Sequence, residues 1–357
     1  MEDNLFIQSY YYYIIAFLCL LTFLSLFSYL NNYASSKKLI NILVFLFAGF
    51  TVFYIGGRSS SIGTDTLRYE KAFRFYEDTQ KFIIRKDVFY DFLSYSFAKL
   101  LGFQELLVFC AFLYVFGAYY GLKKIFKENL YLPFIVFLIS PYFFTSGINV
   151  MRSGVAASLF LVGLGMYYDK RKFFLTFFCF FVSVLFHISM FVPLMFFILA
   201  RYLKNTKVIF IAWLLSIVVG MLNINIVRVV VESIGIFEDR VGDYVINEGE
   251  RSFWTNFAIF GAFPVLFAIY NVLVLKYKHD FYIWLLNGYM LIHMPYIMLL
   301  NSEYALRLGY LAEFMMPIVL LFPLLINPKW EIRYIRLKLC LILFAVFLVK
   351  AYKILII

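Results

Sequence analysis

The sequence predicts an all-α polytopic integral membrane protein with about 10–12 transmembrane helices, each needing about 20 apolar residues. Three observations lead to this prediction: 64% of the 357 residues are apolar, only 15% are charged, and the mean hydropathy is +0.86. Soluble domains are about half apolar and about a quarter charged. So much apolar surface is stable only when lipid surrounds it.

Ten segments are apolar and long enough to cross the hydrocarbon core. They are residues 10–30, 39–57, 104–122, 130–146, 148–168, 207–224, 254–275, 281–299, 303–326 and 337–357. Two further segments each allow two interpretations. Residues 88–101 are short and carry Asp91 and Lys99, which predicts an interfacial or re-entrant segment. Residues 173–200 are long for one helix and form either a hairpin that turns near His187 or a single tilted span.

Basic residues gather in six short loops between these segments. The loops are residues 35–38, 123–128, 169–172, 201–207, 276–280 and 327–338. This pattern predicts that the six loops face the cytoplasm. The net charge of +11 therefore reflects topology, and we expect no nucleic-acid partner. Since no repeat or linker divides the chain, we expect one transmembrane domain over residues 1–357, with outer loops at 58–87 and 225–253.

With this topology, several polar residues meet at the outer half of the membrane, where charged groups are costly and are candidates for function. They are Arg58, Asp65, Asn149, Arg152, His187, Glu303, Arg307 and Tyr310. Some of them also allow simpler roles. Arg58 is compatible with snorkelling at a helix end, Asp65 with a helix cap, and His187 with a structural histidine. Glu303 and Arg307 are compatible with mutual neutralisation. Arg152 is flanked by small residues, so its helix is expected to be buried among other helices.

The chemistry of this group suits an anionic lipid. Arginine forks onto phosphate oxygens and stays protonated, and a nearby carboxylate or histidine can act as general base for a sugar hydroxyl. No DxD-type acidic pair lies beside the arginines, which predicts a site without metal or other cofactor. Glu77-Asp78 and Glu238-Asp239 are interpreted as solvated loop charges.

At these residues the chain resembles the Wzy/EpsG-like family of bacterial O-antigen and exopolysaccharide repeat-unit polymerases. The resemblance extends from residue 58 to residue 317. Its motifs are Arg58…Gly63-Thr64-Asp65-Thr66…Tyr69…Phe73, Ile148-Asn149-Val150-Met151-Arg152-Ser153-Gly154-Val155-Ala156, Phe186-His187-Ile188-Ser189, and Arg307…Tyr310 before Pro317. Ser153 and Leu311 depart from the family pattern, in which a glutamine and an aromatic residue are expected.

The resemblance implies a fold similar to the GT-C glycosyltransferases and a specific reaction. A glycan on undecaprenyl diphosphate would be transferred onto the non-reducing end of a second undecaprenyl-diphosphate-linked repeat unit. Arg58, Arg152 and Arg307 would neutralise the diphosphate, and either Asp65 or His187 would be the base. The resemblance also places Asn149 and Tyr310 at the substrate, with Glu303 orienting Arg307.

The expected location is the bacterial cytoplasmic (inner) membrane, with several spans and the active site on the periplasmic or extracellular side. The expected partners are the donor and acceptor oligosaccharide lipids and membrane lipid, and a chain-length regulator is a further candidate.

Two other classes of function stay open at this point. One is another lipid-linked-sugar glycosyltransferase or an O-antigen ligase, although a ligase is expected to carry a larger outer loop than 225–253. The other is a non-enzymatic flippase or transporter of lipid-linked oligosaccharide, which would need charges along a path through the midplane. His293 and Glu313 lie deep enough for such a path, but we interpret both as hydrogen-bond partners between helices.

Overall fold

The structure is a computed structural model and describes residues 2–30, 36–84, 86–169, 173–222, 262–299, 305–326, 335 and 337–345. Over these ranges every regular element is a helix, as the composition predicts. The helices form two compact units. The first comprises Met1–Ile188 and Leu324–Ile357, and the second comprises Ser189–Pro323.

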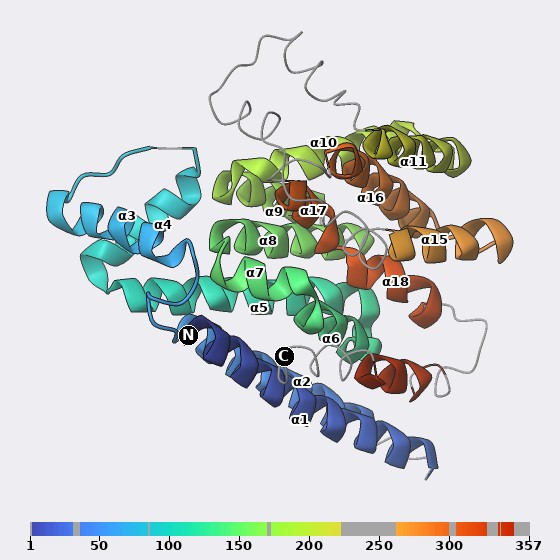
Figure 1. Ribbon diagram of the computed structural model, residues 1–357, viewed down its shortest axis with the longest axis horizontal. Coiled ribbons are helices and arrows are strands. Elements are labelled where there is room, and N and C mark those ends of the chain that lie inside the picture. Colours follow the sequence, from blue (N-terminus) through green and yellow to red (C-terminus); the bar gives the residue numbers. More distant parts are fainter. Residues whose placement is uncertain are drawn as a thin grey trace, which may run out of the picture. The chain divides into compact units, whose positions relative to one another are not determined.

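Three helices of the first unit pack side by side: α5 (Phe103–Phe126), α8 (Met151–Tyr168) and α9 (Phe173–Phe186), as Figure 1 shows. Glycines permit the closest approach of α5 to α8. A Cβ atom added to Gly121 would lie only 2.5 Å from the carbonyl oxygen of Leu161. Small residues let membrane helices pack this closely, so α8 is buried, as its composition predicts.

Serine hydroxyls also join these three helices. Ser158 Oγ on α8 donates to the carbonyl oxygen of Tyr114 on α5 over 2.6 Å. Ser183 Oγ on α9 donates to the carbonyl oxygen of Ala156 on α8, also over 2.6 Å. Hydrogen bonds of this kind contribute roughly 0.6 kcal/mol each between helices in lipid. They fix the register of the bundle that carries the site described below.

The described residues include four segments that are long and apolar enough to cross a membrane. These are Leu5–Phe27 in α1 (Glu2–Leu30), Lys38–Gly56 in α2 (Ser36–Gly56), Phe103–Asn129 and Arg307–Leu325. A bent pair of helices, α6 (Tyr131–Ile139) and α7 (Pro141–Ile148), makes a fifth if it counts as one span. The chain is therefore a polytopic membrane protein, with fewer full-length spans in this part than the ten to twelve that hydropathy predicts.

One cause of the difference is that the predicted span at 130–146 is broken. Its two halves, α6 and α7, are bent by 68°. The break lies at Ser140, whose hydroxyl donates to the carbonyl oxygen of Phe137 and accepts from the backbone N–H of Phe143. A proline begins α7, where its missing N–H leaves no helical hydrogen bond unmade. Hydropathy alone does not register such a break.

The long apolar run at 173–200 is also divided. Helix α9 ends at Phe186, His187 is non-helical, and the chain continues as η2 (Ile188–Met190) and α10 (Phe191–Tyr202). The break at His187 is therefore confirmed. A hairpin at this point stays a prediction, because the border between the two units follows at once.

The predicted outer loop 58–87 contains α3 (Thr66–Thr79), and residues 88–100 form α4 (Val88–Leu100). The buried residues of α3 recur every three or four positions: Thr66, Tyr69, Phe73 and Tyr76. Helix α4 packs against α5 and α9. At 13 residues it is about 20 Å long, too short to cross a hydrocarbon core of about 30 Å. The other predicted outer loop, 225–253, lies outside the described residues.

In the second unit, α16 (Asp280–Met298) packs against α10, α11 (Thr206–Met221) and α17 (Ala305–Glu313). The other elements among the described residues are η1 (Lys127–Asn129) in the first unit, and α15 (Phe263–Ile269), η4 (Tyr270–Val274) and α18 (Met316–Leu325). Trp213 Nε1 on α11 donates to His293 Nδ1 on α16 over 3.1 Å. His293 is thus a hydrogen-bond partner between helices, as the sequence predicts.

Candidate active site

An ion pair joins the start of α8 to the start of α4. Arg152 Nη1 donates to Asp87 Oδ2 over 2.6 Å, with the Asp87 side chain only 5% exposed and that of Arg152 37% exposed. Such short, charge-assisted bonds are about twice as strong as neutral ones. The buried carboxylate therefore holds the guanidinium in place, while the Arg152 side chain as a whole stays partly exposed.

The same carboxylate also contacts the break after α9. His187 Nδ1 lies 3.2 Å from each Asp87 oxygen, and the backbone N–H of Ile188 donates to Asp87 Oδ1 over 3.1 Å. The His187 side chain is 26% exposed. Asp87 thus places an arginine and a histidine from distant parts of the chain next to each other.

Two tyrosine rings flank the guanidinium. Arg152 Cζ lies 5.3 Å from the ring centre of Tyr69 on α3 and 5.5 Å from that of Tyr90 on α4. Cations within about 6 Å of an aromatic ring centre are attracted to its face. We call Asp87, Arg152, His187, Tyr69 and Tyr90 the Asp87 cluster; all five belong to the first unit.

The electrostatics of the cluster keep Asp87 ionised. Burial by itself would raise the pKa of the Asp87 carboxyl. The hydrogen bond and charge of His187, the charge of Arg152 and the N–H of Ile188 outweigh burial, so the pKa lies below its ordinary value. At neutral pH Asp87 is therefore a carboxylate, which accepts hydrogen bonds and donates none.

Arg58 has a different environment from Arg152. Its Nη1 donates to the carbonyl oxygen of Ile55 over 2.8 Å, and its Nη2 donates to that of Ile148 over 3.1 Å and to Thr66 Oγ1 over 3.5 Å. The residue is 2% exposed. Burial lowers the pKa of Arg58 to about 10, so it stays charged at neutral pH. With these hydrogen bonds Arg58 connects the ends of α2 and α7. This geometry favours a structural role over direct contact with a lipid diphosphate.

We expect the substitution Arg58→Ala to destabilise the protein before it affects chemistry. The oxygens of Ile55 and Ile148 would lose a buried donor, at about 1–3 kcal/mol for each unsatisfied group. The measurement is the unfolding temperature of the purified protein in detergent. Arg68→Ala is the matched control, because the Arg68 side chain is 80% exposed and its pair with Asp65 is solvated. Equal unfolding temperatures for the two variants would contradict the structural role of Arg58.

The loop after α2 docks onto the corner between α7 and α8. Thr64 N donates to Asn149 Oδ1 over 3.0 Å, and Tyr69 Oη donates to the carbonyl oxygen of Asn149 over 3.2 Å. Gly63 has φ +92°, and a Cβ atom there would lie 2.6 Å from Ile148 Cγ2. Asn149, which the sequence places among the substrate-binding residues, here anchors the loop that carries Tyr69 to Arg152.

Asp65, one of the two predicted bases, lies apart from this arrangement. It stands at the N-cap position of α3 without a side-chain capping bond, and its carboxylate pairs with Arg68 over 3.4 Å. Within the described residues no hydrogen bond joins Asp65 to Asp87, Arg152 or His187. The structure therefore brings His187 to Arg152, whereas the half-buried Asp65 pairs with the exposed Arg68.

The third predicted arginine belongs to the second unit. Arg307 is exposed and Tyr310 half-buried on α17, and Glu303 lies outside the described residues. Arg307 and Tyr310 belong to a different unit from Arg152, and their approach to Arg152 stays a prediction.

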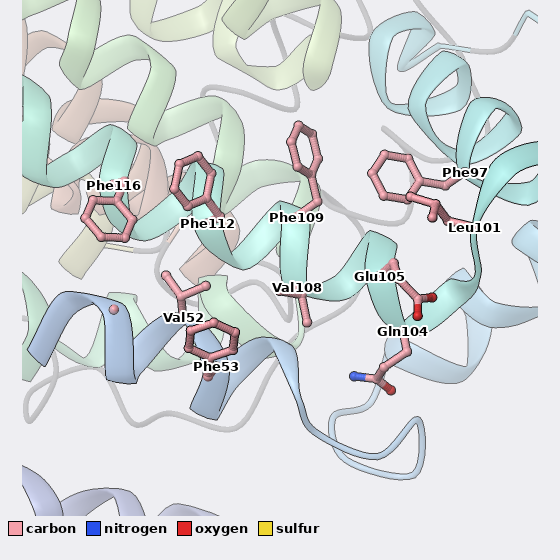
Figure 2. Close-up of a pocket in the computed structure, with 11 residues that line it drawn as sticks. Val52, Phe53, Phe97, Leu101, Gln104, Glu105, Val108, Phe109, Phe112 and Phe116 are labelled. Atoms are coloured by element: carbon pink, nitrogen blue, oxygen red, sulfur yellow. The ribbon is translucent and has the colours of Figure 1, made fainter. Parts of the chain in front are cut away.

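An apolar groove of about 670 Å³ lies elsewhere in the first unit, between α2, the end of α4 and α5. Figure 2 shows the rings of Phe53, Phe109, Phe112 and Phe116 along it, with Gln104 and Glu105 at one end. None of its lining residues belongs to the Asp87 cluster. The groove is thus separate from the polar site.

Asp87 was not among the residues that the sequence indicated. It follows Lys86 near the end of a charged loop, where a carboxylate is usually solvated. One signal was present in the sequence: Asp87 directly precedes the aromatic start of the 88–101 segment, the position of a helix cap. That signal identifies a cap, and only the fold shows that the carboxylate points at Arg152 and His187 instead.

Comparison with known proteins identifies the family of the chain. A search of curated proteins and a search of solved structures each found no match. A model of the EpsG family matches residues 41–356, which include the whole Asp87 cluster. This family has a polysaccharide-polymerase-like, glycosyltransferase-like role. Since the match covers most of the chain, the protein belongs to the EpsG family.

Proposed function

We propose that this protein is a repeat-unit polymerase. It transfers a glycan from undecaprenyl diphosphate onto the non-reducing end of a second undecaprenyl-diphosphate-linked repeat unit. The reaction takes place without a metal ion at the outer face of the bacterial cytoplasmic membrane. The observation that carries the proposal is the Asp87 cluster, in which a partly exposed guanidinium and a histidine share one buried carboxylate.

Arg152 is the group proposed to bind the diphosphate. Its Nη1 is held by Asp87 and its Nε is buried, while the side chain as a whole is 37% exposed. A guanidinium has five N–H donors in a fixed fork, so donors remain for phosphate oxygens. The flanking rings of Tyr69 and Tyr90 fix the plane of this fork.

His187 is the group proposed to activate the acceptor. The acceptor hydroxyl oxygen attacks C1 of the donor sugar, and its proton passes to Nε2 of His187. The bond between C1 and the diphosphate oxygen breaks, and undecaprenyl diphosphate leaves with the electron pair. Arg152 stabilises the charge that develops on this leaving group, the kind of electrostatic term that contributes most to many enzymes.

The proposal is tested with purified protein in lipid nanodiscs, supplied only with lipid-linked repeat units. The expected products are a ladder of longer glycans on lipid together with free undecaprenyl diphosphate, one for each bond formed. In a parallel reaction that also contains a lipid A-type acceptor, transfer to that acceptor without a ladder would identify a ligase instead. In a parallel preparation of the protein in vesicles, movement of the lipid-linked unit across the membrane without new glycosidic bonds would identify a flippase, and either result would overturn the proposal.

A further inference from the structure

We propose that Asp87 is a positioning residue that fixes the tautomer of His187, so that Nδ1 carries the proton and Nε2 presents a lone pair to the substrate. This inference deepens the proposed function, on which its catalytic meaning rests. It concerns a residue that neither the sequence motifs nor the family match assigns to the site.

The geometry around the carboxylate determines which histidine nitrogen carries the proton. Two of the donors to Asp87 are invariably N–H groups: Arg152 Nη1 at 2.6 Å and the backbone N–H of Ile188 at 3.1 Å. The Arg152 charge at 2.6 Å keeps the Asp87 carboxyl ionised, and an ionised carboxylate only accepts hydrogen bonds. The contact at 3.2 Å from each oxygen to His187 Nδ1 is therefore a hydrogen bond that Nδ1–H donates. In a neutral imidazole, Nε2 is then the acceptor.

The position of Asp87 at the start of α4 also supports this role. Aspartate at an N-cap usually accepts from the N–H groups of the first turn, which contributes about 1 kcal/mol. Asp87 stands at the N-cap of α4 but makes no side-chain capping bond. Its carboxylate contacts Arg152 and His187 instead. The hydrogen bond that would stabilise the first turn of α4 is therefore not made, and the carboxylate binds distant residues.

The accessibility of the two side chains agrees with this division of roles. The Asp87 side chain is 5% exposed, whereas that of His187 is 26% exposed. A buried carboxylate behind a partly exposed imidazole orients the ring without touching the substrate. Asp87 also holds Arg152, so one residue fixes both the proposed base and the proposed diphosphate ligand.

The test is Asp87→Asn in the full-length protein in nanodiscs. The asparagine carbonyl still accepts from Arg152, but its amide donates to Nδ1 and moves the histidine proton to Nε2. We expect polymerisation to fall by about 100-fold to 10,000-fold, the range of general-base and tautomer effects. The fall is expected mainly in kcat, with a smaller change in KM for the lipid-linked unit. Activity within about threefold of wild type would overturn the inference, since even a weak general-base effect exceeds that.

A second measurement does not depend on polymerase activity. The chain has 3 histidines, so nitrogen NMR of isotope-labelled histidine is simple enough to assign with a His187→Gln difference spectrum. In the neutral imidazole we expect the proton on Nδ1 in the wild type, and on Nε2 in Asp87→Asn. A neutral wild-type imidazole with its proton on Nε2 would overturn the inference. Failure of the proposed function would appear separately, as a correct tautomer in a protein that makes no glycan ladder.

Discussion

Replacing Arg152 with alanine is expected to abolish polymer while the lipid-linked repeat units remain intact. The diphosphate would lose the guanidinium that stabilises its developing charge. Removing one such group costs about 100-fold to 1,000-fold in kcat. The measurement is ladder formation from lipid-linked repeat units, with surface glycan length in cells as a second readout.

Arg152→Lys is expected to fail as well, because a point charge cannot fork onto two phosphate oxygens. The matched control is Arg74→Ala, which removes an arginine of α3 that pairs with Glu70 and whose side chain is 67% exposed. That variant is expected to keep full activity. Full activity of Arg152→Lys would contradict the proposed role of the guanidinium.

Replacing His187 with glutamine is expected to reduce the rate of polymerisation by about 100-fold to 10,000-fold, the usual effect of a general base. The sign of the pH dependence follows from the chemistry. A base must be unprotonated to accept the hydroxyl proton, so wild-type activity falls as the pH is lowered. The variant is expected to lose this acid limb, which is measured as a pH–rate profile of kcat at saturating substrate.

Asp65→Asn distinguishes the two bases that the sequence predicts. Since Asp65 pairs with exposed Arg68, its variant is expected to keep both the activity and the acid limb. His279→Gln, a histidine of the second unit, controls for loss of an imidazole elsewhere. If the Asp65 variant loses the acid limb and the His187 variant keeps it, Asp65 is the base and the role given to His187 is wrong.

The two arginines of the first unit show why a sequence motif cannot assign roles by itself. Arg58 and Arg152 both lie in motifs that carry the family resemblance, and the resemblance implies the same partner, a lipid diphosphate, for both. In the fold, Arg58 donates to backbone oxygens and is 2% exposed, while the Arg152 side chain is 37% exposed beside a carboxylate. The difference depends on which oxygens lie nearby, and those belong to residues far away in the chain.

The sequence predicts that the apolar segments are helical, and the reason is physical. Apolar runs long enough for lipid must form helices, because backbone polar groups have no other partners there. The break at Ser140 limited the prediction of complete spans. It depends on local hydrogen bonds and on a proline, and average hydropathy over a window does not respond to them.

By itself, the sequence determined that the chain is an α-helical membrane protein, and it indicated a site that includes Arg152 and His187. Both follow from composition and from the cost of placing charge beside lipid. Only the tertiary structure showed that Asp87 holds these two residues together. It also showed that Arg58 is buried and hydrogen-bonded to backbone oxygens of two helices. The physical reason is that a hydrogen bond depends on distance and direction in space, whereas Asp87, Arg152 and His187 are separated by 65 and 35 positions along the chain.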